Sequence, residues 1–322
     1  MAPSITYVQN SLFAAQIDAR KGEMADAFFE GSPLFAWAKT RREDQSEGER
    51  FFLPIEYDEN STVSMIGKGG TVSLADQDVF TNAYYSKKTM AANVTQFRDD
   101  TLANRGEGMV FKLIDKKIDN LVKSKQTKFE DQLVATSLTA GNINPLSTLV
   151  EGTLEASQTT TVGGISRSTY DWWRNSSRTM TGVATDTYIQ EYFQDAYNEV
   201  EKEGSGPPDA ILTDNQTHMD YENYALLDKQ YVNTMIGDVS FTLMHYKGVP
   251  CIKVPKMSNA RRAYFLTSST IAFFITPDMW FEWTDWKEPD NQPFDKVRQC
   301  VSQCQLGISN PRLNHVIYSI DT

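Results

Sequence analysis

The side chains of this sequence with the greatest potential for metal binding or nucleophilic chemistry are its three cysteines and three histidines. Cys300 and Cys304 form a close pair, but no second pair accompanies them to complete the tetrahedral ligand set of a zinc site. His218, His245 and His315 stand far apart, and none lies beside a cysteine or in an H-E-x-x-H arrangement. We therefore assign no metal-binding or cofactor-binding residues, and we interpret the cysteines as small apolar side chains.

Motifs for other common reactions are also missing from the sequence. It contains no G-x-S-x-G nucleophile elbow. The glycines at 67–70 and 163–164 lack the spaced Gly-Lys-Ser/Thr of a phosphate-binding loop. Carboxylates are plentiful, but their spacing decides neither for nor against a glycosidase pair. We assign no catalytic residues.

Two groups of tryptophans are candidates for ligand binding, namely Trp172 with Trp173, and Trp280, Trp283 and Trp286. Exposed aromatic rings can stack on sugars or bases. The later group alternates along a segment that we expect to be a strand, which is more typical of a core or a subunit interface. We favour a packing role for the tryptophans and keep carbohydrate binding as the alternative.

The composition indicates a folded, acidic protein. The chain has 322 residues, of which 40% are hydrophobic and 23% charged, so it can bury a sizeable core in more than one domain. Its net charge of −11 argues against a protein that coats nucleic acid, because phosphate contacts need clustered cations. The start MAPSITYVQN lacks the features of a signal peptide, and no later segment could span a bilayer. We expect a soluble protein made in a cytoplasm, without a membrane partner.

The first half of the chain begins with segments that cannot form a core alone. Residues 1–50 have the character of an arm, because short apolar clusters alternate with polar residues. Residues 51–97 are rich in Val, Thr, Tyr and Phe around the glycines at 67–70, which predicts a long antiparallel ribbon. Since a two-stranded ribbon is only marginally stable in water, both segments need another surface.

Helices and further strands follow the ribbon. Apolar residues recur at helical spacing from Val110 to Leu133, which predicts a long helix over residues 107–140. Lysines on another face of this helix alternate with acidic residues, which favours a solvated or subunit-facing side over nucleic-acid binding. The segment 185–203 predicts a second helix, followed by the strand DAILT and a helix around 216–227. The remainder is predicted to be mainly strands, so the fold class is α+β.

Several motifs occur in the order typical of one family. They are FTNAYYSKKTMAANVT before the long helix, TVGGISRSTYDWWRN at the centre, PDAILTDNQTHMDYENY, and the late YFLTSSTIAFFITP and QCQLGISNPRLNHV. On these motifs the chain, from about Leu53 to Ile317, resembles tailed-bacteriophage major capsid proteins, whose fold is shared with herpesvirus capsids and encapsulins. The resemblance implies an N-terminal arm (1–50), an extended β-hairpin loop (51–97), a peripheral domain (98–164) with a spine helix (107–140) and a long β-sheet, an axial α/β domain (165–262) and a return to the peripheral domain (263–322).

The resemblance also implies roles for two groups of residues. The ribbon tip would contact a neighbouring subunit through Ile66, Gly67, Lys68, Gly69 and Gly70. The central motif would form a domain joint from Gly163, Gly164, Ile165, Trp172, Trp173, Arg174 and Asn175.

The function implied by the resemblance is that of a major capsid protein, a structural protein and not an enzyme. Its copies would self-assemble as pentamers and hexamers into the icosahedral head of a tailed bacteriophage, which encloses weakly contacted double-stranded DNA. Separate scaffolding, portal and decoration proteins are further candidate partners. The location would be the virion capsid, assembled in the cytoplasm of a host bacterium. The alternatives are an encapsulin-like compartment and, from another class, a carbohydrate-binding or enzyme domain built on the tryptophans.

Overall fold

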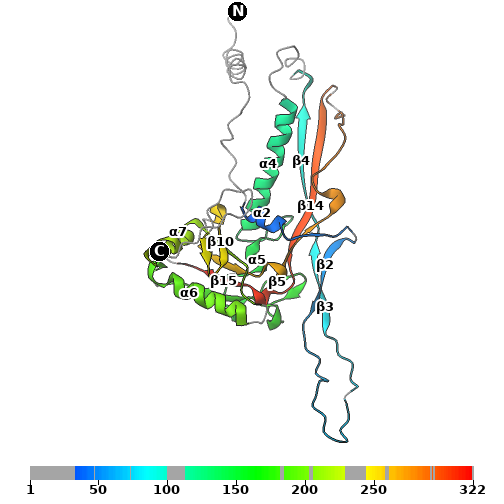
Figure 1. Ribbon diagram of the computed structural model, residues 1–322. Coiled ribbons are helices and arrows are strands. Elements are labelled where there is room, and N and C mark those ends of the chain that lie inside the picture. The colour runs from blue at the N-terminus through cyan, green and yellow to red at the C-terminus, as the bar shows by residue number, and fades with distance from the viewer. Residues whose placement is uncertain are drawn as a thin grey trace, which may run out of the picture. The chain divides into compact units, whose positions relative to one another are not determined.

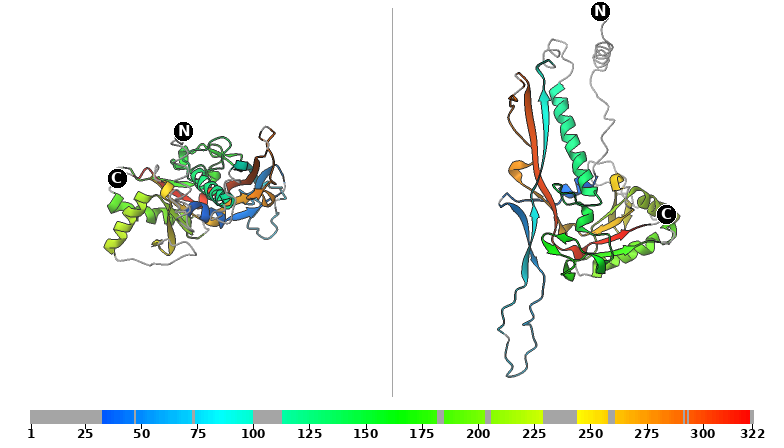
Figure 2. Two further views of the ribbon diagram at one scale, coloured as in Figure 1. Left: turned by 90° about the horizontal axis from the view of Figure 1, so that it is seen from above. Right: turned by 180° about the vertical axis from the view of Figure 1, so that it is seen from behind.

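The computed structural model describes residues 33–46, 48–72, 74–99, 113–181, 185–202, 206–228, 244–257, 261–290, 292 and 294–320 (Figure 1; two further views in Figure 2). Most of the predicted arm, up to residue 32, and the expected start of the long helix, residues 107–112, lie outside this part. The chain forms two compact units. The larger comprises the described residues within 33–90, 128–280 and 302–320, and the smaller comprises those within 91–127 and 281–301.

The larger unit contains a mixed six-stranded sheet in the order β7-β15-β11-β8-β10-β9. Its strands are β7 (Ser176–Thr179), β8 (Ala210–Thr213), β9 (Met244–Tyr246), β10 (Val249–Lys253), β11 (Ala263–Leu266) and β15 (His315–Tyr318). The helices α6 (Thr185–Val200) and α7 (Asn215–Asp228) contribute Phe193 and Tyr221 to its core, where the Phe193 ring lies 5.1 Å from that of Phe265. Both helices and the buried strand DAILT are therefore confirmed.

A second sheet has five strands, in the order β1-β12-β14-β13, with β4 also paired to β14. Its strands are β1 (Arg42–Asp44), β4 (Lys88–Gln96), β12 (Ile271–Ile275), β13 (Glu282–Trp283) and β14 (Lys296–Ile308). Cys300 and Cys304 are both buried on β14, but the Cys300 thiol lies 3.5 Å from Lys125 Nζ, so it is not the purely apolar side chain we expected. Residues of β14 belong to both units, pairing with β13 in the smaller and with β12 in the larger.

The tryptophans of the segment 280–286 pack inside their own units. Trp283 and Trp286 pack in the smaller unit against a cluster of Val94, Leu121 and Cys300. Trp280, in the larger unit, lies 5.7 Å from Phe129 and 5.8 Å from Phe273 between ring centroids. These contacts support a packing role for all three indoles.

The long helix α4 (Leu113–Val134) is shorter than predicted, and the expectation of helix up to residue 140 was wrong. The apolar repeat stops at Leu133, and the carbonyl of Ala135 accepts from the Ser147 hydroxyl at 2.7 Å. Hydroxyl-bearing residues then form a loop, consistent with their tendency to compete with helical hydrogen bonds. None of the helices in the described parts of the chain combines the length and the apolar content that a membrane span needs.

The ribbon is also shorter than the predicted range 51–97. The strands β2 (Arg50–Glu56) and β3 (Phe80–Ser86) pair antiparallel, and one further hydrogen bond runs from the Tyr57 N–H to the Val79 carbonyl at 3.0 Å. Beyond it lies a long loop, in which the Asn60 side chain accepts from the Thr62 N–H at 2.9 Å and so forms a turn in place of a strand. The end of the predicted ribbon is β4, which joins the five-stranded sheet instead.

The expected boundary at residue 262 does not separate the two sheets. In the segment 263–322, β11 pairs with β8, and β15 pairs with β11 and β7, all within the six-stranded sheet. The reason is that β8 is buried on both faces and needs a hydrogen-bonded strand on each side, which β10 and β11 supply. The division into peripheral and axial domains stays a prediction.

The helix α2 (Pro33–Lys39) is anchored by a buried carboxylate of α4. Glu130 accepts from the N–H groups of Leu34 at 3.1 Å and of Phe35 at 2.6 Å, which satisfies two amides of the first helical turn. The Phe35 ring stacks on Phe129, with centroids 5.2 Å apart. Burial raises the pKa of Glu130 to about 7, against the opposing effect of the two N–H donors and Lys256.

This raised pKa predicts a pH-dependent stability. Because folding raises the pKa of Glu130 above its ordinary 4.5, its contribution to the free energy of unfolding is fully present below that value and is lost as the pH rises through about 7. We expect Glu130→Gln to remove this slope from urea unfolding measured between pH about 5 and about 8. Glu155→Gln, at an exposed carboxylate, is the control that should leave the slope unchanged. Parallel slopes for the parent and Glu130→Gln would contradict the assignment.

Candidate functional site: the ribbon and its seat

Within the larger unit, Tyr85 attaches the ribbon of β2 and β3 to Ile308 and Phe274, which we call the seat of the ribbon. The Tyr85 side chain is 2% exposed, and its hydroxyl donates to the Ile308 carbonyl at 2.7 Å and accepts from the Ile308 N–H at 3.0 Å. Burial raises the pKa of Tyr85, which keeps the hydroxyl protonated and able to donate. Phe51, opposite Tyr85 in the ribbon, stacks on Phe274 with centroids 5.2 Å apart. The end of the ribbon that carries Phe51 and Tyr85 is its root. It is held by the two buried hydrogen bonds of the Tyr85 hydroxyl, which we call the clamp, and by the aromatic contact of Phe51.

Two glycines allow the ribbon to approach its seat. A Cβ at Gly307 would lie 2.6 Å from the Phe274 ring and 2.9 Å from the Tyr85 ring. A Cβ at Gly163 would lie 2.7 Å from the Cβ of Ala83 on β3. Side chains at either position would push the ribbon away.

Gly163 belongs to a tight hairpin of β5 (Thr161–Val162) and β6 (Ile165–Ser166). Gly163 and Gly164 have φ values of +61° and +80°, as a two-residue turn with positive φ at both positions requires. The Gly163 carbonyl accepts from the Tyr84 N–H at 2.9 Å. The double glycine thus turns the chain and also binds the edge of the ribbon.

Arg167 holds the segment behind this hairpin. Its side chain is fully buried, and its guanidinium donates to the carbonyls of Trp173 (3.1 Å), Leu149 (2.5 Å) and Thr148 (3.3 Å), to Thr160 Oγ1 (3.1 Å) and to Glu151 Oε2 (3.3 Å). Burial lowers the pKa of Arg167, whereas the carboxylate of Glu151 opposes this shift. A buried charge needs such partners, because an unpaired one is strongly destabilising.

Further hydrogen bonds within the same part of the chain come from Trp173, Arg174 and Asn175. The Trp173 indole is 1% exposed and donates from Nε1 to the Val162 carbonyl at 3.0 Å. Asn175 is buried and exchanges two hydrogen bonds with the backbone of Glu151, at 2.8 Å and 3.1 Å. Arg174 donates to the Arg167 carbonyl at 2.7 Å. These bonds make the central motif a rigid support for the hairpin.

Trp172 connects this segment to the ribbon. Its ring stacks on Tyr57, just beyond β2, at 5.3 Å and also contacts Tyr170 at 5.7 Å and Trp173 at 5.5 Å between centroids. Three neighbouring rings contact one indole, which leaves it poorly suited to stack on a sugar. The arrangement favours packing over the carbohydrate-binding alternative.

The two groups of predicted site residues lie apart within the larger unit. One segment of the chain, which contacts the ribbon through Gly163 and Trp172, holds Gly163, Gly164, Ile165, Trp172, Trp173, Arg174 and Asn175. The tip, Ile66–Gly70, closes a turn at the far end of the loop, where the Gly70 N–H donates to the Gly67 carbonyl at 2.9 Å (Figure 1). Their roles as a domain joint and a subunit contact stay predictions.

Sequence reasoning missed Tyr85, Arg167 and Gly307. Arg167 could have been noticed as a cation between the hairpin and the tryptophans, in a segment that otherwise indicated burial. Tyr85 and Gly307 carry no such signal, because their contact joins distant parts of the chain.

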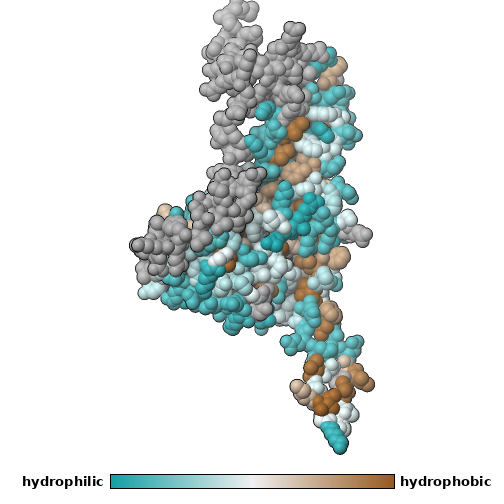
Figure 3. Space-filling view, in the orientation of Figure 1, coloured by the Kyte–Doolittle hydropathy of each residue, from teal (hydrophilic) through white to brown (hydrophobic). Residues whose placement is uncertain are grey.

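The ribbon exposes apolar side chains on the face away from its seat and along its loop. Phe52 and Tyr84, directly opposite each other, are each 50% exposed. In the loop Met65 is 104% and Leu74 97% exposed, and Figure 3 shows the apolar side chains gathered there. Large exposed apolar patches mark sites of interaction with other molecules.

A histidine and a cysteine do meet, but in the core of the six-stranded sheet. His218 Nδ1 lies 3.7 Å from Cys251 Sγ and 3.2 Å from Thr213 Oγ1. Burial raises the pKa of Cys251 to about 12, and burial also lowers the pKa of His218. A thiol this difficult to ionise is a poor nucleophile. Within the described ranges, no group of His, Cys, Asp or Glu side chains could hold a metal ion.

The two glycines of the hairpin offer a matched pair of substitutions. Gly163→Ala should destabilise the protein more than Gly164→Ala, because both residues have positive φ but only the first new Cβ meets the ribbon. We expect an excess loss of about 1–3 kcal/mol in the free energy of unfolding, measured with denaturant. Equal losses would show that the ribbon does not press on the hairpin.

The clamp can be tested with two neighbouring tyrosines. Tyr85→Phe leaves the Ile308 N–H and carbonyl without their partner and should cost about 1–3 kcal/mol of unfolding free energy. Tyr84→Phe, at a half-exposed ring, should change it by less than about 0.5 kcal/mol. A neutral Tyr85→Phe would rule out the clamp as a source of stability.

Comparison with known proteins identifies the fold. No family model and no curated protein sequence match the chain. Among solved structures, the capsid asymmetric unit of cyanophage A-1(L) has a TM-score of 0.72 at 16% identity, covering 94% of this chain and 97% of that chain. The capsid of cyanophage P-SCSP1u has a TM-score of 0.62 at 10% identity, covering 93% and 91%. The holo-SrpI encapsulin complex from Synechococcus elongatus PCC 7942 has a TM-score of 0.57 at 10% identity, covering 96% and 95%. The chain therefore has the shell fold of tailed-phage capsid and encapsulin proteins, which confirms the fold predicted from its motifs.

Proposed function

We propose that this chain is the major capsid protein of a tailed bacteriophage, and that its copies assemble into an icosahedral head around double-stranded DNA. The observation that carries the proposal is a ribbon with a locked root and an uncovered apolar face. Because Tyr85, Phe51 and Gly163 fix the root, the side of the ribbon that bears Phe52 and Tyr84 faces away from the subunit's own core. Another molecule must cover these side chains, and the shell fold supports further copies of the chain as that molecule.

The proposed mechanism of assembly is the sum of many modest contacts. In pentamers and hexamers, each copy would lay its ribbon on a neighbour and receive a ribbon in turn. Contacts that are weak one by one become strong when a subunit makes several at once. The ribbon tip, Ile66–Gly70, would lie in such a contact.

The remaining parts of the proposal follow from the charge and chemistry of the chain. The net charge of −11 favours weak contact with packaged DNA. A structural role without catalysis agrees with a core in which His218 and Cys251 pack without an ionised thiol. Scaffolding, portal and decoration proteins are proposed as further partners, with the virion as the location and a bacterial cytoplasm as the site of assembly.

Assembly can be tested by electron microscopy and light scattering of the purified chain. We expect closed particles or defined capsomers from the parent. The double variant Met65→Ser, Leu74→Ser should leave the subunit's unfolding free energy within about 0.5 kcal/mol, because both side chains are exposed, but should impair shell formation. Leu154→Ser, an exposed apolar residue outside the ribbon, is the matched control and should assemble normally.

A parent chain that stays monomeric at high concentration would refute the proposal. Normal shell formation by the double variant would refute the role of the ribbon loop in assembly. The content of particles isolated from the natural source would distinguish a phage head from an encapsulin-like compartment. Packaged double-stranded DNA would support the phage head, whereas an enclosed protein cargo would support the encapsulin-like compartment.

A further inference from the structure

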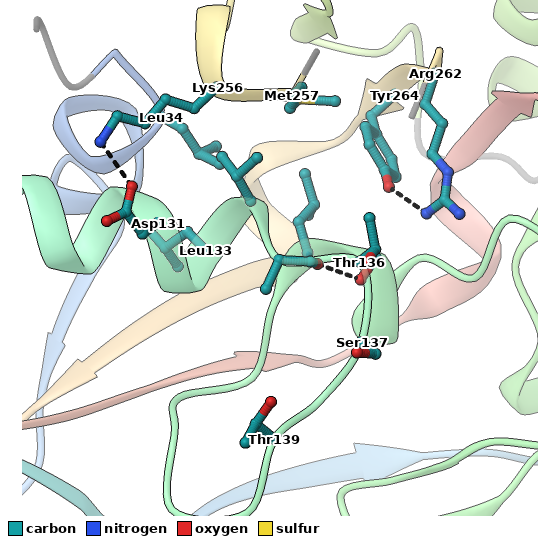
Figure 4. A pocket seen from close by; sticks show the side chains of 14 residues that line it. Leu34, Asp131, Leu133, Thr136, Ser137, Thr139, Lys256, Met257, Arg262 and Tyr264 are labelled. Carbon is teal, nitrogen blue, oxygen red and sulfur yellow. Dashed lines mark hydrogen bonds and ion pairs between the residues drawn. The ribbon is translucent and has the colours of Figure 1, made fainter. Parts of the chain in front are cut away.

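A cavity of about 460 Å³ lies in the larger unit, and no residue of the ribbon lines it (Figure 4). It is lined by residues from the end of α4 and the loop after it, from α5 (Leu146–Leu149), from the turn Pro255–Met257 and from β11. Leu34, Leu133, Leu146 and Met257 give it apolar walls, and Thr136, Ser137, Thr139 and Ser147 supply hydroxyls. Its volume is in the range of small-molecule binding sites.

Arg262 is the unusual residue of this cavity. It is half-buried, and within the described residues its guanidinium has one hydrogen bond, to Tyr264 Oη at 3.2 Å, and no carboxylate partner. It also packs on the backbone of Gly152, where a Cβ would lie 3.4 Å from the Arg262 Cζ. The guanidinium is thus held in position without being neutralised.

Several other arginines of the larger unit have a carboxylate partner, which Arg262 lacks among the described residues. The adjacent Arg261 lies 2.5 Å from the Asp220 carboxylate. Carboxylates also lie within ion-pair distance of Arg41, Arg42, Arg167, Arg174 and Arg178. A partly buried cation loses hydration, and an anion that enters the cavity would compensate for that loss.

We propose that this cavity binds a monocarboxylate with an apolar body, its carboxylate on Arg262 and its body against Leu34, Leu133 and Met257. The planar guanidinium matches a carboxylate in a bidentate geometry. On the opposite side of the cavity, Asp131 and Lys256 form an ion pair at 2.7 Å, so their charges compensate each other (Figure 4). Arg262 therefore offers one positive charge, which matches an anion of one charge better than phosphates and other anions with several charges.

The test uses the full chain with octanoate and 1-octanol, titrated by calorimetry. These probes share an apolar body and differ in charge, so we expect octanoate to bind at least about tenfold more tightly. Arg262→Gln should weaken octanoate binding by about tenfold and leave 1-octanol unaffected. Arg50→Gln, at an exposed arginine that does not line the cavity, is the matched control and should change neither affinity.

Two sources could supply this chemistry, a free organic acid or the carboxyl terminus of an apolar peptide. A short leucine-rich peptide with a free C-terminus, compared with its amidated form, distinguishes them. Tighter binding of the free-acid peptide than of octanoate assigns the cavity to a chain terminus, and the reverse order assigns it to a small acid.

Three results would overturn the proposal. One is equal affinity of the unmodified chain for octanoate and 1-octanol, a comparison that needs no variant and so remains decisive if Arg262→Gln fails to fold. Another is octanoate binding that Arg262→Gln does not change. The third is the absence of binding by both octanoate and the free-acid peptide up to about 10 mM.

Discussion

The hydroxyl of Tyr85, bound to both backbone groups of Ile308, is the contact on which the arrangement of the ribbon depends. It joins the ribbon to the end of β14 at a buried point, where a lost hydrogen bond would leave a donor and an acceptor unsatisfied. The bare backbones of Gly307 and Gly163 let the Tyr85 ring and β3 approach. Since the seat accepts one arrangement of the root, the direction in which the ribbon leaves the subunit is set before any neighbour is met.

Arg167 supports the same arrangement at greater energetic cost. A fully buried guanidinium is expensive to desolvate, and its five acceptors and the charge of Glu151 offset that cost only in one geometry. Lysine could not replace it, because an ammonium cannot reach carbonyls spread around a plane. The positions of these acceptors fix the guanidinium within the central motif, and Trp173 connects that motif to the hairpin through its hydrogen bond to Val162.

Local features of this fold could be predicted from the sequence, whereas contacts between distant segments could not. Apolar periodicity predicted α6, and a helix was also expected where α7 lies. The end of α4 was placed too late although the apolar repeat stops at Leu133, and just beyond the helix the Ala135 carbonyl accepts from the Ser147 hydroxyl. The pairing of β4 with β14 and of β11 with β8 was missed because a strand's partner is chosen by the whole sheet. The overall fold was reached through motifs that resemble a family, since no periodicity would have produced it.

The burial of all three cysteines has a practical consequence for labelling the protein. Cys251, Cys300 and Cys304 form no disulfide and are buried, and burial also raises the pKa of Cys251 to about 12, which keeps its thiol protonated. A cysteine introduced at an exposed position such as Leu154 would therefore be the one thiol open to maleimide reagents, with no need to remove the natural ones. The same substitution would give every single copy of the chain one attachment point for a fluorophore or a peptide.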